Sequence, residues 1–448
     1  MEAWRAVGSW LADVFLWLRG FPVRRTASFL MSSQWWEPEE LKRYQDELLR
    51  RLIRHAYDNV PYYREVMQQR KLTPADFNGV EDLVKLPVLS KDEVRKNYHR
   101  LEARDCRGER FIRTTGGTTG EPLRVVTDKH TGVWSAAAFR RGYSWAGYRP
   151  GSGLAKLTGG SLGPGKETWR QRLRSWLTGE IFLPAFELSR ENVKLYVEKI
   201  KNRRVRFLRG YTSTVYQLAT LIREAGLRLT LEAVFTTAET IHPFQRQTII
   251  ETFGCPVFDG YGCGEINSVA FECEEHRGLH ISQENVVVEC LRGGERVKAG
   301  EMGKVTLTDL RNYAMPIIRY QNDDLASFAT EPCSCGRGLP LLEKIHGRSN
   351  DFLVAADGRL VSGSFIPHLF RHTCGIRQVQ VEQAEDRTLT IRMVKGPAWS
   401  LEEEKMVVQL LQKYLGGLEM HLEYVPEILP TPSGKLKFVI SRAAEQIF

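Results

Sequence analysis

A run rich in glycine and threonine at residues 113–122 has the clearest chemical use in this chain. It lies between the apolar pair Phe111-Ile112 and a β-prone stretch at 123–126, so we expect a loop that joins two strands. Successive backbone N–H groups of such a loop can face one anion, and threonine hydroxyls add donors. The run therefore predicts a phosphate-binding loop. Walker spacing is absent, and an ordinary Gly-Thr hairpin is the alternative.

Four further segments follow this loop along the chain. They are Tyr261-Gly262-Cys263-Gly264-Glu265, Arg319-Tyr320-Gln321-Asn322-Asp323-Asp324-Leu325, Gly347-Arg348-Ser349-Asn350-Asp351 and Pro432-Ser433-Gly434-Lys435. With the loop, they resemble the five ordered motifs of the adenylate-forming superfamily, in which ATP activates a carboxylate. The likeness is greatest to phenylacetate-CoA ligases and to their relatives from capsular polysaccharide gene clusters, because residues 52–64 and 86–91 are typical of that branch.

The resemblance implies a nucleotide site. It assigns the phosphates of ATP to the loop residues Thr114, Thr115, Gly116, Gly117, Thr118, Thr119 and Gly120. It places Glu239, Tyr261 and Gly262 in the nucleotide pocket and gives Mg²⁺ to Glu265, since a hard cation on phosphates prefers carboxylates. Asp324 would accept hydrogen bonds from the two ribose hydroxyls.

One departure from the family pattern and two basic residues complete the expected site. Asp323 stands where glycine is usual, and we expect its like charge to raise one pKa of the pair with Asp324. Arg348 would begin a small C-terminal domain and contact ribose or phosphate, with the hinge at Asn350. Lys435 is the expected catalytic residue, because a mobile ammonium can bind both the carboxylate and the α-phosphate. Taken alone, its segment would be a solvated turn.

Soft metal ligands gather in two clusters. Cys333 and Cys335 are one residue apart, and Cys273 precedes two histidines, His276 and His280. A structural zinc ion needs four such ligands in a tetrahedron. We favour Cys273, His280, Cys333 and Cys335, with His276 as the substitute ligand, and the resemblance also implies zinc here. Buried free thiols are the alternative.

The elements that must position these residues alternate strand and helix. Short β-prone runs at 205–208, 233–235 and 257–258 enclose helical runs at 215–224 and 243–253. This order predicts an α/β fold with a mainly parallel sheet flanked by helices. Ligands in such folds bind beyond the carboxyl ends of strands. The acid pocket should therefore lie among Trp145, Tyr211, Thr236, Thr237 and residues 159–161, but no pattern there names a substrate.

Composition narrows the class of protein. The 448 residues are enough for two or three domains, and the apolar and charged fractions are those of a globular protein. A net charge of +9 favours anionic ligands, and the basic residues are scattered without a nucleic-acid-binding signature. Eight cysteines without a cleavable signal fit the cytoplasm better than a secreted disulfide framework.

The N-terminus predicts an amphipathic helix. Its apolar face comprises Trp4, Val7, Leu11, Val14, Phe15 and Leu18, with Trp10 and Trp17 nearby, and arginines follow. The run is too short to span a bilayer. It could lie on an anionic membrane surface, or pack on its own domain or in a homodimer.

We therefore expect an N-terminal helical segment at 1–36, a large ATP-binding domain at 37–346 and a small mobile α+β lid domain at 347–448. The predicted activity is ATP- and Mg²⁺-dependent formation of an acyl adenylate, followed by transfer to CoA. One alternative is transfer of the acyl or AMP group to another acceptor, such as an amino sugar in capsule synthesis. The other, prompted by Asp323 and Asn350, is a scaffold without ATP turnover.

Overall fold

The computed structural model describes residues 2–106, 108–115, 123–158, 175, 178–348, 352–363, 375–396, 399–429 and 439–445. Several predicted positions lie outside these residues. They are the loop glycines and threonines at 116–120, Asn350 as the expected hinge, Lys435 as the expected catalytic residue, and residues 159–161 of the expected acid pocket. The side chain of Thr115 is also outside the described part.

A twelve-stranded sheet forms the centre of the molecule, in the order β11-β10-β12-β13-β14-β9-β8-β7-β6-β5-β3-β4. Its parallel half consists of β3 (Leu154–Thr158), β4 (Glu180–Pro184), β5 (Phe207–Tyr211), β6 (Ala233–Thr237) and β7 (Val257–Tyr261). Its antiparallel half consists of β8 (Ala270–Glu272), β9 (Leu279–Ile281), β10 (Val286–Arg292), β11 (Glu295–Arg296), β12 (Gly303–Asp309), β13 (Tyr320–Phe328) and β14 (Leu341–Arg348).

The predicted α/β class is confirmed, but the sheet is mixed rather than mainly parallel. Helices α9 (Val193–Asn202), α10 (Thr212–Glu224) and α11 (Pro243–Phe253) alternate with strands only as far as β7. From β7 to β14 the strands follow one another without an intervening helix, and the neighbouring strands that are joined this way, such as β7 with β8 and β8 with β9, pair antiparallel.

Each face of the parallel half has its own core. On one face, α10 buries Val215, Leu218, Ala219 and Ile222, which recur at helical spacing, against β-strand side chains such as Leu208. On the other face, α7 (Lys129–Ser144) packs over aromatic side chains of β5, β6 and β7. Tyr143 and Phe235 stack there with ring centroids 4.0 Å apart.

The predicted phosphate loop is flanked by a hairpin, as expected. Strands β1 (Arg110–Thr115) and β2 (Leu123–Asp128) pair antiparallel, with Thr115 opposite Leu123. The loop residues between these two partners lie outside the described part of the chain.

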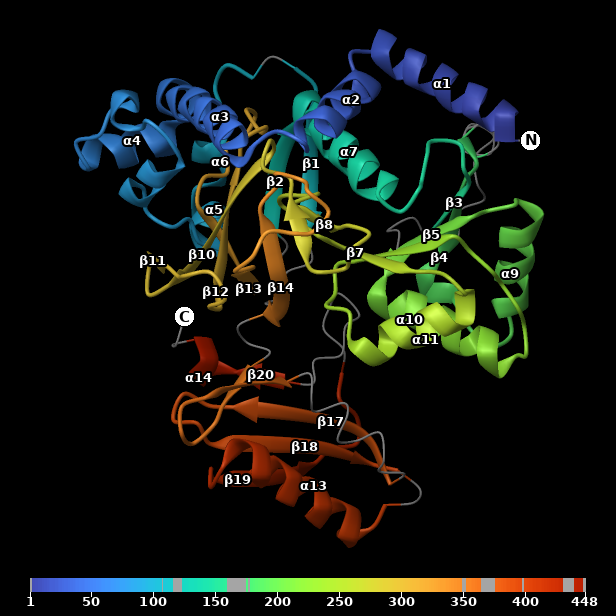
Figure 1. Cartoon of the computed structure of the whole chain (residues 1–448). Helices are drawn as coiled ribbons and strands as arrows, with labels where there is room; N and C mark the ends of the chain where they lie inside the picture. Colours follow the sequence, from blue (N-terminus) through green and yellow to red (C-terminus); the bar gives the residue numbers. More distant parts are fainter. Residues whose placement is uncertain are drawn as a thin grey trace.

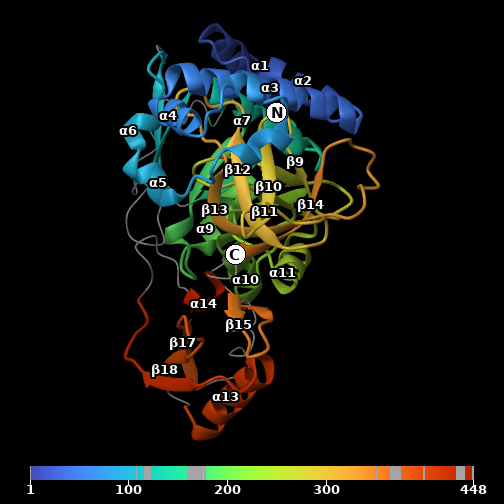
Figure 2. The same ribbon diagram turned by 90° about the vertical axis from the view of Figure 1, so that its left-hand side faces the viewer.

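The antiparallel half is covered by helices from the N-terminal part of the chain (Figures 1 and 2). They are α2 (Val23–Ser33), α3 (Pro38–Asn59), α4 (Pro61–Gln69), α5 (Lys91–Lys96) and α6 (Tyr98–Leu101). Helix α3 begins at Pro38 and ends at Asn59, before Pro61. Ser90 and Glu93 form a capping box at the start of α5, since Ser90 Oγ accepts from the Glu93 N–H at 3.2 Å.

The C-terminal part forms a separate four-stranded sheet at the far end of the molecule from α2 and α3 (Figures 1 and 2). Its strands are β17 (Ile376–Gln383), β18 (Leu389–Lys395), β19 (Met420–Tyr424) and β20 (Val439–Ser441), with α13 (Leu401–Leu415) packed on one face and α14 (Arg442–Glu445) after β20. A hairpin of β15 (Phe352–Val354) and β16 (Leu360–Ser362) adjoins this sheet. Buried Gln383 joins it to β17, because its amide bonds both the N–H and the carbonyl oxygen of Val354 at 2.8 Å.

Candidate active site

Three motif segments that are far apart in sequence meet at Asp324. Tyr261 ends the parallel strand β7, Asp324 lies in β13, and Arg348 ends the neighbouring strand β14, where it pairs with Asp324. The sheet order places β7 and β14 on either side of the short strands β8 and β9. These short strands bring the carboxyl end of the parallel half next to β13 and β14.

The Asp324 carboxylate is held by two donors on one oxygen. Oδ2 accepts from the Tyr261 hydroxyl at 2.8 Å and from Asn322 Nδ2 at 2.7 Å. Oδ1 lies 3.5 Å from Nε of Arg348. Because each carboxylate oxygen has two acceptor sites, Oδ1 keeps capacity to accept from a ligand hydroxyl.

Burial raises the pKa of Asp324, and Arg348, the Tyr261 hydrogen bond and Lys91 act in the opposite direction. The like charge of Asp323, which the sequence suggested as the cause, is a lesser contribution to this raised pKa. Asp323 forms an ion pair with Lys91 of α5. Its φ of +69° lies in the left-handed region that glycine adopts most readily.

Glu265 lies in the segment after β7 and is 6% exposed. Burial, and then the charge of Glu265, raise the pKa of the Tyr320 hydroxyl and of the Cys263 thiol. Gly262 is required for the tight path of this segment, since a Cβ there would lie 3.0 Å from the Ser268 nitrogen. Glu265 therefore lies in the segment that directly follows Tyr261, the residue that bonds Asp324.

Strand β1, which leads into the predicted phosphate loop, contacts the segment that follows Tyr261. Arg113, next to Thr114 on β1, lies 2.8 Å from the side-chain oxygen of Asn267 when that amide is oriented to donate to the Cys263 carbonyl. Burial lowers the pKa of Arg113, and the charge of Asp309 opposes this. The hairpin that carries the loop therefore packs against the Tyr261–Glu265 segment.

Glu239 occupies a different position from the Asp324 cluster. Its carboxylate accepts from the Ser213 N–H at 2.7 Å, at the N-terminus of α10, and its carbonyl oxygen accepts from Thr212 Oγ1 at 3.0 Å. Glu239 thus joins the carboxyl ends of β5 and β6, where negative charge is favoured by the helix dipole.

Of the described residues expected in the acid pocket, only Thr236 and Thr237 line one cavity together. Thr236 and Thr237 line a narrow cavity together with Phe139, Gly142, Tyr143, Phe235, Phe258, Asp259, Gly260, Phe271 and Glu272. Trp145 does not line this cavity. It is buried instead beside α2, where its Nε1 donates to Gln34 Oε1 at 2.8 Å and its ring lies 5.6 Å from that of His280.

The predicted soft ligands come together between β8, β9 and the segment before β14. The ligand atoms of Cys273, His280, Cys333 and Cys335 all lie within 4.8 Å of one another. The Cys273 and Cys333 sulfurs are 3.8 Å apart, and Cys335 Sγ is 3.3 Å from His280 Nε2. Tetrahedral zinc with Zn–S bonds of about 2.3 Å requires sulfurs about 3.8 Å apart, so the four atoms fit one zinc ion.

The histidine orientation also fits a metal ligand. His280 Nδ1 lies 3.3 Å from the Leu339 carbonyl oxygen, which fixes the tautomer and turns Nε2 toward the cysteines. His276, considered as a substitute ligand, is outside the group. Its Nδ1 pairs with Glu272 at 3.2 Å, and its φ of +51° marks a turn.

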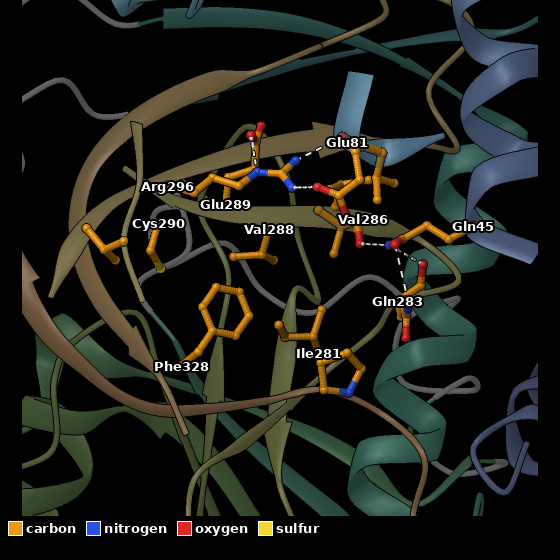
Figure 3. A pocket seen from close by; sticks show the side chains of 14 residues that line it. Gln45, Glu81, Ile281, Gln283, Val286, Val288, Glu289, Cys290, Arg296 and Phe328 are labelled. Atoms are coloured by element: carbon orange, nitrogen blue, oxygen red, sulfur yellow. Dashed lines mark hydrogen bonds and ion pairs between the residues drawn. The ribbon is translucent and has the colours of Figure 1, made fainter. Parts of the chain in front are cut away.

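A groove of about 230 Å³ lies away from these residues, on the antiparallel half between β10 and α3 (Figure 3). Its apolar floor includes Val286, Val288, Ile281 and Phe328. Gln45 crosses one end, where its amide donates to the Gln283 and Val286 carbonyl oxygens at 3.0 Å. No predicted site residue lines this groove.

Sequence reasoning assigned no role to several residues of the site. Asn322 and Lys91 stand inside segments quoted for the family likeness, yet their partners became visible only in three dimensions. Asn267 and the half-buried Arg113 carried no signal beyond their nearness to a motif.

The fold is that of the adenylate-forming CoA ligases. A crystal structure of 2-hydroxyisobutyryl-CoA ligase in the postadenylation state, in complex with R3-HIB-AMP, is similar with a TM-score of 0.70 and 19% identity, and the match covers 92% of this chain and 93% of that chain. O-succinylbenzoate coenzyme A synthetase from Bacillus subtilis, in complex with AMP, is similar with a TM-score of 0.52 and 16% identity over 73% of this chain and 67% of that one.

Sequence comparison gives the family. A phenylacetate-coenzyme A ligase of Thermus thermophilus is 30% identical over 70% of this chain and 72% of its own length. Protein CapK of Staphylococcus aureus is 23% identical over 90% of each chain, and the model of the CapK C-terminal domain matches residues 353–442. The chain belongs to the phenylacetate-CoA ligase family of adenylate-forming enzymes.

The helices in the described part of the chain include none with both the length and the hydrophobicity that a membrane span needs.

Proposed function

We propose that this protein uses ATP to convert a carboxylic acid into an acyl adenylate and then transfers the acyl group to CoA. The observation that carries the proposal is the cluster at Asp324, where Tyr261, Asn322 and Arg348 orient one carboxylate from three motif segments. Oδ1 of Asp324 would accept the ribose hydroxyls of ATP. The family relationship to phenylacetate-CoA ligases supports the same reaction.

In the first step, a carboxylate oxygen of the acid would attack the α-phosphorus of ATP, and pyrophosphate would leave. The loop residues 114–120 would bind the phosphates, and Lys435 would bind the carboxylate and the α-phosphate oxygens. Arg348, beside Asp324, would contact ribose or phosphate. Positive charge and fixed donors are needed because two anions must meet.

Glu265 would hold Mg²⁺, which neutralises the phosphates when it is bound. A buried carboxylate beside the loop base fits a cation that takes one or two carboxylates and otherwise water or phosphate oxygens. Tyr261, Gly262 and Glu239 would line the nucleotide pocket. Since Glu239 caps α10 next to Thr237, its role there would be to hold the two strand ends together.

In the second step, the CoA sulfur would attack the acyl carbonyl carbon, and AMP would leave. This step requires a lid of about residues 347–448 that rotates at Asn350. The match to the CapK C-terminal domain covers residues 353–442, within this lid. In the alternative proposal, another acceptor, such as an amino sugar in polysaccharide synthesis, receives the acyl or AMP group.

Cys273, His280, Cys333 and Cys335 would hold a structural zinc ion. With four protein ligands the site is closed, so zinc would tie β8 and β9 to the segment before β14 rather than take part in the reaction. Zinc would thereby support the short strands that place Tyr261 next to Asp324. Three reduced thiolates also suit the cytoplasm.

The proposal is tested by pyrophosphate release from ATP and Mg²⁺ with a panel of aromatic and aliphatic acids, with and without CoA. We expect acid-dependent release that falls by about a hundredfold or more in Lys435→Ala and persists in the neighbouring control Lys437→Ala. Mass spectrometry of the product then separates a CoA thioester from another acyl or adenylyl product. ATP binding without release for any acid would favour the scaffold alternative.

A further inference from the structure

Helix α1 (Glu2–Leu18) turns its apolar face toward solvent. The large apolar side chains with the following exposed fractions lie on it: Val7 50%, Trp10 49%, Leu11 50%, Phe15 59%, Trp17 60% and Leu18 70%. At about 100° per residue, these six positions span roughly 160° of the helix circumference. A continuous aromatic and aliphatic surface is therefore open on one side of α1.

The opposite face of α1 holds the helix to the protein. Ser9 and Asp13 are 6% and 9% exposed. Arg140 of α7 binds both carboxylate oxygens of Asp13, with one contact of 2.9 Å. The helix thus packs on its own domain through this face, and the six exposed apolar side chains lie outside that contact.

Positive charge adjoins the exposed apolar face. The Arg19 guanidinium lies 5.8 Å from the ring centroid of Phe15, and Arg24 and Arg25 are exposed in the first turn of α2. Asp13 is the only acidic residue between Val7 and Trp36, and Arg140 neutralises it. Between Val7 and Trp36 the exposed charged side chains are therefore all arginines, namely Arg19, Arg24 and Arg25.

We propose that α1 lies in the plane of an anionic lipid surface, with its apolar face among the acyl chains and these arginines on the lipid phosphates. Tryptophan and arginine suit the boundary between headgroups and hydrocarbon, and an in-plane helix needs no membrane span. A second copy of the chain would cover the apolar face but would bring no acidic groups from this surface to the arginines. Charge complementarity therefore favours lipid.

This contact also fits the shape of the molecule. Figures 1 and 2 both show α1 at the end opposite the four-stranded C-terminal sheet. A lipid surface at α1 would leave that sheet directed away from the membrane and free to move. The inference concerns a surface outside the Asp324 cluster and does not depend on the proposed reaction.

The test is flotation of the full-length protein with vesicles of phosphatidylcholine alone or with added phosphatidylglycerol. We expect binding to be at least about tenfold stronger with phosphatidylglycerol, and to weaken at high salt because screening reduces the attraction of arginine to phosphate. The double variant Phe15→Glu/Trp17→Glu should lose about tenfold or more, and Arg24→Gln/Arg25→Gln should lose the preference for anionic vesicles.

Leu195→Glu is the matched control, because Leu195 is 63% exposed on α9, away from this surface. It should bind vesicles as the unchanged protein does, and all variants should keep the melting temperature because the altered side chains are exposed. Equal binding to both vesicle types, or unchanged binding of Phe15→Glu/Trp17→Glu, would overturn the proposal. So would a dimer, seen by light scattering, that this double variant converts to a monomer.

Discussion

The hydroxyl of Tyr261 donates a hydrogen bond of 2.8 Å to Oδ2 of Asp324, which joins the end of a parallel strand to an antiparallel strand 63 residues later. Asn322 Nδ2 donates to both groups, at 2.9 Å to the tyrosine oxygen and 2.7 Å to the carboxylate. The three side chains form a closed triangle. Asp324 can keep its position only while β7 and β13 keep theirs.

Replacement of Tyr261 by phenylalanine should make adenylation sensitive to acid. The Tyr261 hydrogen bond lowers the pKa of Asp324 against the effect of burial, so its loss should raise that pKa further. More of the carboxylate would then be protonated, and the acid limb of the rate profile should move to higher pH. We expect a loss of roughly tenfold in kcat/KM for ATP at neutral pH and more below it, measured by pyrophosphate release.

The matched control is Tyr196→Phe, which removes a hydroxyl that donates to the Pro184 carbonyl oxygen at 2.7 Å near α9. It should leave the pH profile in place. An equal loss at every pH in Tyr261→Phe would contradict a role through the Asp324 carboxylate.

The Asp323→Gly variant should be more stable than the Asp323→Ala variant. This is the reverse of the usual order, in which alanine is the more stabilising residue. Asp323 has a φ of +69°, which an L-residue adopts at a cost and glycine adopts freely. Asp323→Gly and Asp323→Ala both lose the ion pair with Lys91, so their difference isolates the backbone. We expect Asp323→Gly to unfold in urea with a free energy about 1 kcal/mol higher than Asp323→Ala.

The same pair of substitutions at Asp92 provides the control, because Asp92 lies in helix α5 and forms a comparable exposed ion pair with Arg95. There the alanine variant should be the more stable one, by about 0.5–1 kcal/mol. The same order at both positions would exclude the backbone explanation.

The purified protein should contain one zinc ion per chain, held by the four-residue cluster. Cys333→Ser should lose the metal and unfold at a lower temperature, because a closed structural site contributes its binding free energy to folding. Cys255→Ser should keep the metal, since Cys255 is buried outside the cluster and burial raises its pKa to about 12. His276→Ala should also keep it. Metal analysis and thermal unfolding of the four proteins check this.

Asp259 should make the protein less stable as the pH rises from about 4 to 7. Burial, and then the charge of Glu272, raise its pKa from 3.8 to about 7. In this range the folded state keeps a proton that the unfolded state has released, so the free energy of unfolding falls with pH. The fall ends about one pH unit above the folded-state pKa of about 7, where both states have lost the proton.

Asp259→Asn carries no such proton and tests this directly. Between pH 5 and 7 the free energy of unfolding of the unchanged protein should fall by roughly 1–3 kcal/mol more than that of the variant, measured by urea titration. Thr236→Val, which removes the 2.9 Å hydrogen bond to Asp259, should steepen the fall, because that bond lowers the pKa. Parallel curves for the unchanged protein and Asp259→Asn would show that Asp259 is ionised throughout.

The sequence by itself determined the family, the α/β class and the residue types of the site. Ordered motifs, helical and strand periodicity, and the spacing of Cys273, His280, Cys333 and Cys335 are properties of the chain that can be counted without coordinates. The four soft ligands were predicted correctly as neighbours, because few cysteines and histidines competed for the same cluster.

Only the tertiary structure decided which segments meet and which faces are buried. Periodicity marks an apolar face on α1 but cannot say what it contacts, and the ion pair of Asp13 with Arg140 turns that face outward. Likewise, Asn322 acquired Tyr261 as a partner from the sheet order that brings β7 near β13, and Lys91 and Trp145 acquired their partners from helix packing. Such contacts join residues tens to hundreds of positions apart, and no local pattern in the sequence encodes them.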